Sequence, residues 1–186
     1  MNASFEATLR DGKVGESLIA GWFKSRGYNI LPIYEIEINS GKGPRLFTPV
    51  TELVAPDMFI FNANNCYWIE AKHKTAFAWN RMRQIWTTGI DKNHFEQYCK
   101  VDDITPWPVW LMFLHKGGQA KDSPPNSPKG LFGNSLKYLR KNVNHESDKY
   151  GKHGMVYWNK DSLKEICSYE DCIKQSFSLP TKEVSQ

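Results

Sequence analysis

Two apolar segments joined by a four-residue turn are the feature that most constrains how this chain folds. Residues 56–61 and 66–74 are rich in aromatic and β-branched side chains, which is typical of buried strands. Residues 62–65, between them, are all Asn or Ala, and Asn is a common turn residue. The sequence therefore predicts an antiparallel hairpin of two buried strands.

The register of this hairpin brings two carboxylates together. If the turn holds four residues, Phe61 faces Cys66, and the same register makes Asp57 face Glu70. Side chains opposed in this way have Cβ atoms roughly 4.5–5.5 Å apart, so two like charges destabilise the sheet. Among apolar neighbours they require a compensating cation or a shared proton. Because side chains alternate along a strand, Lys72 lies on the same face as Glu70.

This trio is typical of a metal-dependent phosphodiester hydrolase. Mg²⁺, or Mn²⁺ in its place, is usually held by one or two carboxylates, with water and substrate phosphate completing its shell. An ammonium group beside the ion can orient the attacking water or stabilise charge on the phosphate. In the alternative interpretation, Glu70 and Lys72 form an exposed ion pair of little energetic value, and Asp57 caps a strand. The apolar flanking residues favour the metal site.

The same residues resemble a known catalytic motif. Pro56-Asp57, followed by Glu70, Ala71 and Lys72, is similar to the PD-(D/E)xK motif. The nuclease superfamily that carries it includes restriction endonucleases, Holliday junction resolvases and phage-encoded nucleases. The resemblance implies that Asp57 and Glu70 bind the metal and that Lys72 is the catalytic lysine.

A helix expected over residues 12–25 extends the resemblance. Its sequence opens with Gly-Lys-Val-Gly-Glu at positions 12–16, and resembles the first helix of the Holliday-junction-resolvase-like branch, which carries an acidic residue near the metal. This implies that Glu16 is a third metal ligand and a fourth catalytic residue. The alternative is that Glu16 is a first-turn glutamate that interacts favourably with the helix dipole.

The order of the expected elements indicates an α/β fold. It suggests a mixed sheet with helices on both faces, and the resemblance implies a restriction-endonuclease-like sheet core with the order αβββαβ. The first element is a helix over 12–25, capped by Asp11 and stopped at Gly27. A strand over 28–38, kinked at Pro32, and the two hairpin strands follow it. Next come a helical region over 75–101, which Gly89 interrupts and Asp91 caps again, and a strand over 109–114.

The second half of the chain carries fewer signals. A mobile loop is expected over 116–134, a short helix over 136–141, a strand over 155–158, and a final helix that Asp161 caps and that carries Leu163 and Ile166. We expect a single domain over residues 1–175 and a disordered tail over 176–186.

Basic and aromatic residues suggest where a nucleic acid binds. Lys74, Arg81 and Arg83 follow the catalytic strand with Trp79 among them, so cations could hold phosphates while the indole stacks on a base. The alternative is an ordinary helix with a basic face and a Trp-packed core face. Residues 116–153 contain eight Lys or Arg and three Asp or Glu, which suits either a polyanion-binding stripe or a solvated loop.

The remaining expectations concern partners and compartment. The chain has no apolar run long enough to cross a bilayer, and its four cysteines lack the spacing of a zinc site, so we expect a cytoplasmic protein with free thiols. The expected partner is DNA. RNA and a non-catalytic nucleic-acid-binding module remain alternatives, and cleavage of both strands of a duplex would call for a homodimer.

Overall fold

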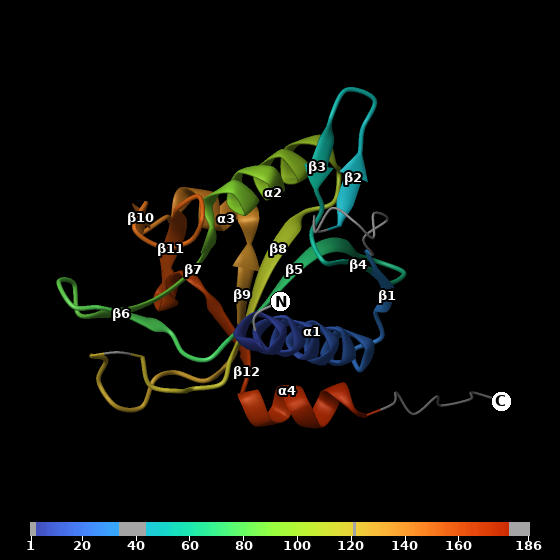
Figure 1. The fold of residues 1–186 in the computed structure, drawn as a ribbon. Helices are drawn as coiled ribbons and strands as arrows, with labels where there is room; N and C mark the ends of the chain where they lie inside the picture. The colour runs from blue at the N-terminus through green and yellow to red at the C-terminus, as the bar shows by residue number, and fades with distance from the viewer. Residues whose placement is uncertain (1–2, 34–43, 121, 179–186) are drawn as a thin grey trace.

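A computed structural model describes residues 3–33, 44–120 and 122–178. The helices are α1 (Ala3–Lys24), α2 (Lys92–Ile104), α3 (Leu136–Lys141) and α4 (Tyr169–Ser176), with a 3-10 turn η1 (Lys160–Ser162). The strands are β1 (Asn29–Pro32), β2 (Arg45–Phe47), β3 (Glu52–Val54), β4 (Met58–Phe61), β5 (Cys66–Lys74), β6 (Ala78–Asn80), β7 (Ile85–Asp91), β8 (Val109–His115), β9 (Gly130–Ser135), β10 (His145–Ser147), β11 (Met155–Asn159) and β12 (Lys164–Cys167) (Figure 1).

A mixed six-stranded sheet forms the centre of the molecule, in the order β1-β4-β5-β8-β9-β12. β5 and β8 are parallel, and the other neighbours are antiparallel. α1 and α4 lie on one side of this sheet, and α2 and α3 on the other (Figure 1). The run α1-β1-β4-β5-α2-β8 confirms the expected αβββαβ order. The β2–β3 hairpin and the β6–β7 pair are inserted into it.

The register predicted for the first hairpin is confirmed. Phe61 pairs with Cys66, and Met58 pairs with Ile69. Asn62 closes the turn, since its side-chain oxygen accepts from the N–H groups of Asn64 and Asn65, each at 2.9 Å. The buried apolar side chains of both strands leave little freedom for a register shift.

The two faces of β5 contribute to two different cores. Trp68 faces the core on the α2 side, together with Leu111 and Phe113 of β8. Ile69 and Ala71 face the core that α1 and α4 cover. The even positions of β5, including Glu70 and Lys72, therefore point towards α2.

The first helix is longer than expected. α1 begins at Ala3, so Asp11 lies inside it and is not its N-cap. The predicted stop at Gly27 is confirmed: its φ is +78°, and the Tyr28 N–H donates to the Phe23 carbonyl at 3.2 Å. The expected strand over 28–38 is observed as β1, Asn29–Pro32, and its remainder from residue 34 lies outside the described residues.

The helical region predicted over 75–101 is half wrong. Its first part forms β6 and β7, which join β10 and β11 in a second, four-stranded sheet. Residues 81–84, between β6 and β7, have good helix propensity, but the pairing of β7 with β11 outweighs it. Gly89 does not break a helix; a Cβ there would lie 2.4 Å from the Val156 carbonyl oxygen. The second part is confirmed as α2, and Asp91 caps it by accepting from the Asn93 N–H at 2.9 Å.

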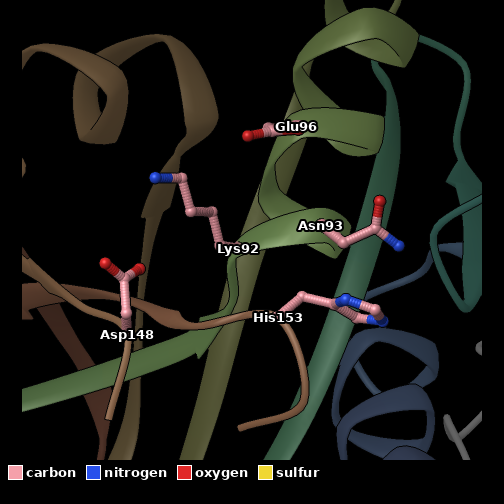
Figure 2. A pocket seen from close by; sticks show the side chains of 5 residues that line it. All are labelled: Lys92, Asn93, Glu96, Asp148 and His153. Atoms are coloured by element: carbon pink, nitrogen blue, oxygen red, sulfur yellow. The ribbon is translucent and has the colours of Figure 1, made fainter. Parts of the chain in front are cut away.

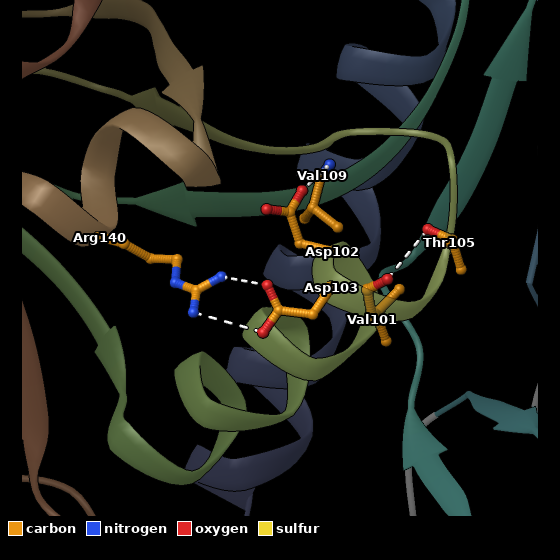
Figure 3. Close-up of polar contacts among 6 residues, drawn as sticks. All are labelled: Val101, Asp102, Asp103, Thr105, Val109 and Arg140. Atoms are coloured by element: carbon orange, nitrogen blue, oxygen red, sulfur yellow. Dashed lines mark hydrogen bonds and ion pairs between the residues drawn. The ribbon is translucent and has the colours of Figure 1, made fainter.

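The far end of α2 is tied to the rest of the fold (Figure 3). The Asp102 carboxylate accepts from the Val109 N–H at 2.9 Å, which connects the helix to the start of β8. Arg140 of α3 donates to Asp103 at 2.5 Å. These contacts fix the position of α2 over the sheet.

Three expectations for the second half are corrected. The loop expected over 116–134 ends early, because residues from Gly130 form β9 and pair with β8. Asp161 lies in the 3-10 turn η1, whose cap is Asn159, and does not begin a helix. Leu163 is buried, Ile166 lies on β12, and the final helix is α4, capped by Ser168.

Two other expectations for this half are confirmed. The short helix over 136–141 is α3, and the strand over 155–158 is β11. The disordered tail is expected from residue 176, but Ser176 is the last residue of α4, and residues 179–186 lie outside the described residues. The four cysteines all belong to the described part and are free thiols there. Within the same part, none of the helices is long and apolar enough to span a membrane.

Candidate active site

Asp57 and Glu70 meet where the first hairpin opens. Asp57 directly precedes β4, and its Oδ2 accepts from the Ala71 N–H at 2.8 Å, across the two strands. Glu70 lies opposite on β5 and is completely buried, with 0% of its surface exposed. The predicted pair of facing carboxylates is thus present, and one of its members has no access to water.

Lys72 lies two positions along the same face and forms an ion pair with Oε1 of Glu70. Its side chain is 28% exposed, so it connects the buried carboxylate to the surface. Burial by itself would lower the pKa of Lys72, but the charges of Glu70 and Asp57 outweigh it and raise the pKa above its ordinary value. Lys72 is therefore a permanent cation at this site.

The pKa of the Asp57 carboxyl is shifted into the neutral range. Burial, followed by the charge of Glu70, raises the pKa of Asp57 from 3.8 to about 7, although Lys72 and the Ala71 N–H act in the opposite direction. One ammonium does not fully compensate two carboxylates in this environment. The site can accept further positive charge.

Glu16 reaches the same cluster from α1. Burial, followed by the charge of Asp57, raises its pKa, and Lys72 lowers it, so both groups lie within electrostatic range. The close approach depends on Gly15, which is buried against β5: a Cβ there would lie 2.3 Å from the Cβ of His73. We call Glu16, Asp57, Glu70 and Lys72 the carboxylate cluster.

Tyr98 of α2 is a member of the site that the sequence did not single out. It is 2% exposed, and burial followed by the charges of Glu70 and Asp57 raises its pKa well above the ordinary value. His94, one turn earlier, lies beside Tyr98 with the two rings tilted by 36° and their centroids 5.9 Å apart. The sequence signal for Tyr98 is its spacing of four residues from His94 on the helix that follows the motif.

The residues expected to bind nucleic acid lie in two places. Lys74 is on β5, on the same face as Lys72; burial, followed by the charge of Lys72, lowers its pKa to about 8. Trp79 is on β6, and Arg81 and Arg83 lie in the turn between β6 and β7. The structure therefore brings Lys74 to the carboxylate cluster and leaves the two arginines on a separate hairpin.

The basic stretch over 116–153 is not a single stripe. It is distributed over β9, α3, β10 and their connections. Two of its cations are already paired, Lys129 with Glu170 and Arg140 with Asp103. Its formal excess of charge is therefore partly neutralised within the molecule.

The donors of the carboxylate cluster suit a hard cation. Among the described residues, no three His, Cys, Asp or Glu side chains are arranged to hold a metal as they stand. Both carboxylate oxygens of Glu70 are nevertheless buried, and no described residue donates a hydrogen bond of good geometry to either of them. Two carboxylates are sufficient for Mg²⁺, which keeps several waters. Asp57 and Glu70 fit such an ion, provided that Lys72 moves off the Glu70 oxygen.

An open pocket of about 400 Å³ lies beside the first turn of α2. Its lining residues come from α2 and from the segment between β10 and β11 (Figure 2), and they are Lys92, Asn93, Glu96, Asp148 and His153. The charge of His153 contributes to a lowered pKa of His94, after burial and Lys72, so the pocket adjoins the cluster. Sequence reasoning did not find this pocket, because its walls are far apart in the chain.

Comparisons with known proteins give little. No protein-family model matches the chain, and no curated protein matches it. Among solved structures, the fold is similar to a 1.6 Å structure of Archaeoglobus fulgidus Hjc, a Holliday junction resolvase from an archaeal hyperthermophile, with a TM-score of 0.47 and 10% identity. The match covers 87% of this chain and 99% of that one. A likeness this distant indicates nothing about activity.

Proposed function

We propose that this protein is a divalent-metal-dependent nuclease that hydrolyses phosphodiester bonds in DNA. The observation that supports it best is the facing pair Asp57 and Glu70 with Lys72 on the same face of a buried strand. A structural ion pair does not require a second carboxylate at this position. A Mg²⁺ site is usually built on one or two carboxylates, and a cation beside it can stabilise charge on a bound phosphate.

Each residue of the cluster has a role in this proposal. Asp57 and Glu70 would hold Mg²⁺ or Mn²⁺, and Glu16 would add a third carboxylate to the ligand set. The bound ion would supply Lewis acidity and a more acidic water. Lys72, released from Glu70, stabilises the negative charge that develops on the phosphate. Tyr98, buried beside Glu70, keeps that carboxylate in position.

The charge around the site favours a polyanionic substrate. Between Glu70 and Asp91 the sequence contains four Lys or Arg and no Asp or Glu. Lys72 and Lys74 lie at the site itself, so a phosphate entering from the Lys72 side meets two cations. Backbone contacts of this kind contribute affinity without sequence preference.

The test is cleavage by the purified protein with Mg²⁺, Mn²⁺ or EDTA, on supercoiled, linear, single-stranded and branched DNA and on RNA. We expect ion-dependent cleavage of DNA that falls by at least about 10³-fold in Lys72→Ala. Lys164→Ala, which removes an exposed lysine from β12, is the matched control and should cleave normally. Cleavage that persists in EDTA or in Lys72→Ala would refute the proposal.

One observation favours a second function. The Lys72–Glu70 ion pair partly neutralises the site without any metal, as in a nucleic-acid-binding module that has lost turnover. Such a module would bind DNA in a salt-dependent manner and cleave none of the substrates in the panel. It would also show no Mg²⁺-dependent increase in thermal stability.

A further inference from the structure

The β6–β7 hairpin exposes an apolar side chain between two cations. Its strands pair Ala78 with Thr87 and Asn80 with Ile85, which leaves a four-residue loop, residues 81–84. We call this loop the hairpin tip; its sequence is Arg81-Met82-Arg83-Gln84. Met82 is 97% exposed. At this exposure the Met82 side chain contributes almost no buried apolar area to the fold, so its apolar surface can contact another molecule.

The hairpin tip is held in one conformation. The Arg83 N–H donates to the Asn80 side chain at 3.1 Å, which closes the loop. Below it, Trp79 and Trp86 form a cross-strand pair with ring centroids 4.9 Å apart in an edge-to-face arrangement. Aromatic cross-strand pairs stabilise hairpins of this kind. Met82 is therefore presented on a supported element.

The hairpin is connected at both ends to elements that carry residues of the site. It begins after β5, which carries Glu70 and Lys72, and it ends at α2, which carries Tyr98. It projects from the body of the molecule beside the segment that follows β8 (Figure 1). The hairpin tip therefore belongs to the segment that joins β5 to α2, the two elements that carry Glu70, Lys72 and Tyr98.

The two arginines have partners that a phosphate could replace. Arg81 pairs with Asp122, and both side chains are largely exposed, at 66% and 42%. Arg83 donates to the Asn144 side chain at 3.2 Å and to its carbonyl. Exposed pairs of this kind contribute little free energy. Exchange for a nucleic-acid phosphate therefore costs little.

From this arrangement we propose that the hairpin tip inserts Met82 into an interrupted base stack in DNA, while Arg81 and Arg83 hold the phosphates on either side. The proposal rests on the proposed function, because it assigns the form of the substrate. Apolar side chains, methionine included, act as wedges between base steps in other DNA-binding proteins. Opening an intact step costs a few kcal/mol, whereas a nick, gap or branch has already lost that stacking. The hairpin tip thus selects DNA with a discontinuity.

The experiment compares binding to a gapped duplex and to an intact duplex of the same sequence, in EDTA so that no cleavage occurs. A 2-aminopurine base beside the gap reports unstacking. We expect wild type to prefer the gapped duplex and to raise the fluorescence. Met82→Ser should lose about tenfold in that preference, equivalent to about 1.4 kcal/mol, together with the fluorescence change. Met82→Leu should retain both.

Val50→Ser is the matched control. Val50 is 92% exposed between β2 and β3, on the other projecting hairpin, and its replacement should change neither signal. Equal preference in wild type and Met82→Ser would overturn the proposal, as would a failure of wild type to bind DNA. Sedimentation that shows a dimer lost in Met82→Ser would overturn it in favour of self-association.

Cleavage assays separate this proposal from the nuclease assignment. If the protein cleaves DNA with Mg²⁺ but Met82→Ser does not change the binding preference, the insertion of Met82 is rejected and the nuclease function is retained. A gap preference that depends on Met82, without cleavage of any substrate, rejects the nuclease and retains the wedge.

Discussion

The β4–β5 and β6–β7 hairpins are both antiparallel and both have four-residue loops, yet they differ in what they expose. The first buries its strands in the central sheet and places its charges inside, with Glu70 at 0% exposure. The second lies at the edge of the smaller sheet and places its charges at an exposed tip, beside Met82 at 97% exposure. Buried charge is suited to chemistry, and exposed charge on a projecting element to recognition.

The largest expected effect is on the first hairpin. Glu70→Gln keeps the size of the side chain and removes the anionic ligand, so cleavage should fall by about 10³-fold or more. The measurement is the single-turnover rate on labelled DNA with saturating Mg²⁺. Glu165→Gln, at an exposed position of β12, is the control. If Glu70→Gln cleaves DNA at a near-normal rate, the buried charge of the first hairpin is not used for chemistry, and the two hairpins do not differ in this respect.

Asp57→Asn should make the metal-free protein more stable at alkaline pH. The pKa of Asp57 is raised to about 7 in the folded state, from 3.8, so the folded state holds a proton that the unfolded chain releases between those values. Stability therefore falls as pH rises from about 4 to about 7.

The asparagine variant removes that decline while its side-chain oxygen can still accept from the Ala71 N–H. We expect a gain of about 4 kcal/mol at pH 8 in EDTA, or roughly 8–16 °C in melting temperature, and little difference near pH 4. Thermal melts across this range provide the measurement. A lower melting temperature for Asp57→Asn at pH 8 would show that the buried charge is compensated by the protein itself.

The smallest effect is expected at the second hairpin. The double variant Arg81→Ala, Arg83→Ala should weaken DNA binding about tenfold and reduce the slope of log K against log salt by about 1.8, since each lost phosphate contact contributes about 0.9. The rate of cleavage of bound DNA should not change. Lys129→Ala removes a cation with a similarly exposed partner, Glu170, and should leave the salt slope unaltered. A changed rate on bound DNA would place the hairpin tip in the chemistry.

The sequence predicted the first hairpin because its signals are local. Apolar strands bounded by an Asn-rich turn define the register by themselves, and the register places Asp57 opposite Glu70. The expected αβββαβ order followed from similar runs. Asp91 was also recognisable, because a cap depends on one side chain and the next two residues.

The second hairpin was missed because its signals are tertiary. Arg, Met and Gln in the loop favour a helix in isolation, and β7 is a strand because β11 pairs along it. β9 and β12 were missed for the same reason, since they complete the edge of the central sheet. Tyr98 could not be assigned to the site until the position of α2 over β5 was known.

Two glycines on α1 limit how sequences with this fold can diverge. A Cβ at Gly15 would collide with His73 of β5, and a Cβ at Gly21 would lie 2.5 Å from the Ser176 carbonyl oxygen of α4. The close packing of α1 against β5 and α4 imposes these two requirements, independently of any reaction at the carboxylate cluster. Relatives that lack the carboxylate cluster should therefore still keep glycine at both positions. That pair of positions offers a way to recognise relatives that a search for the catalytic motif would overlook.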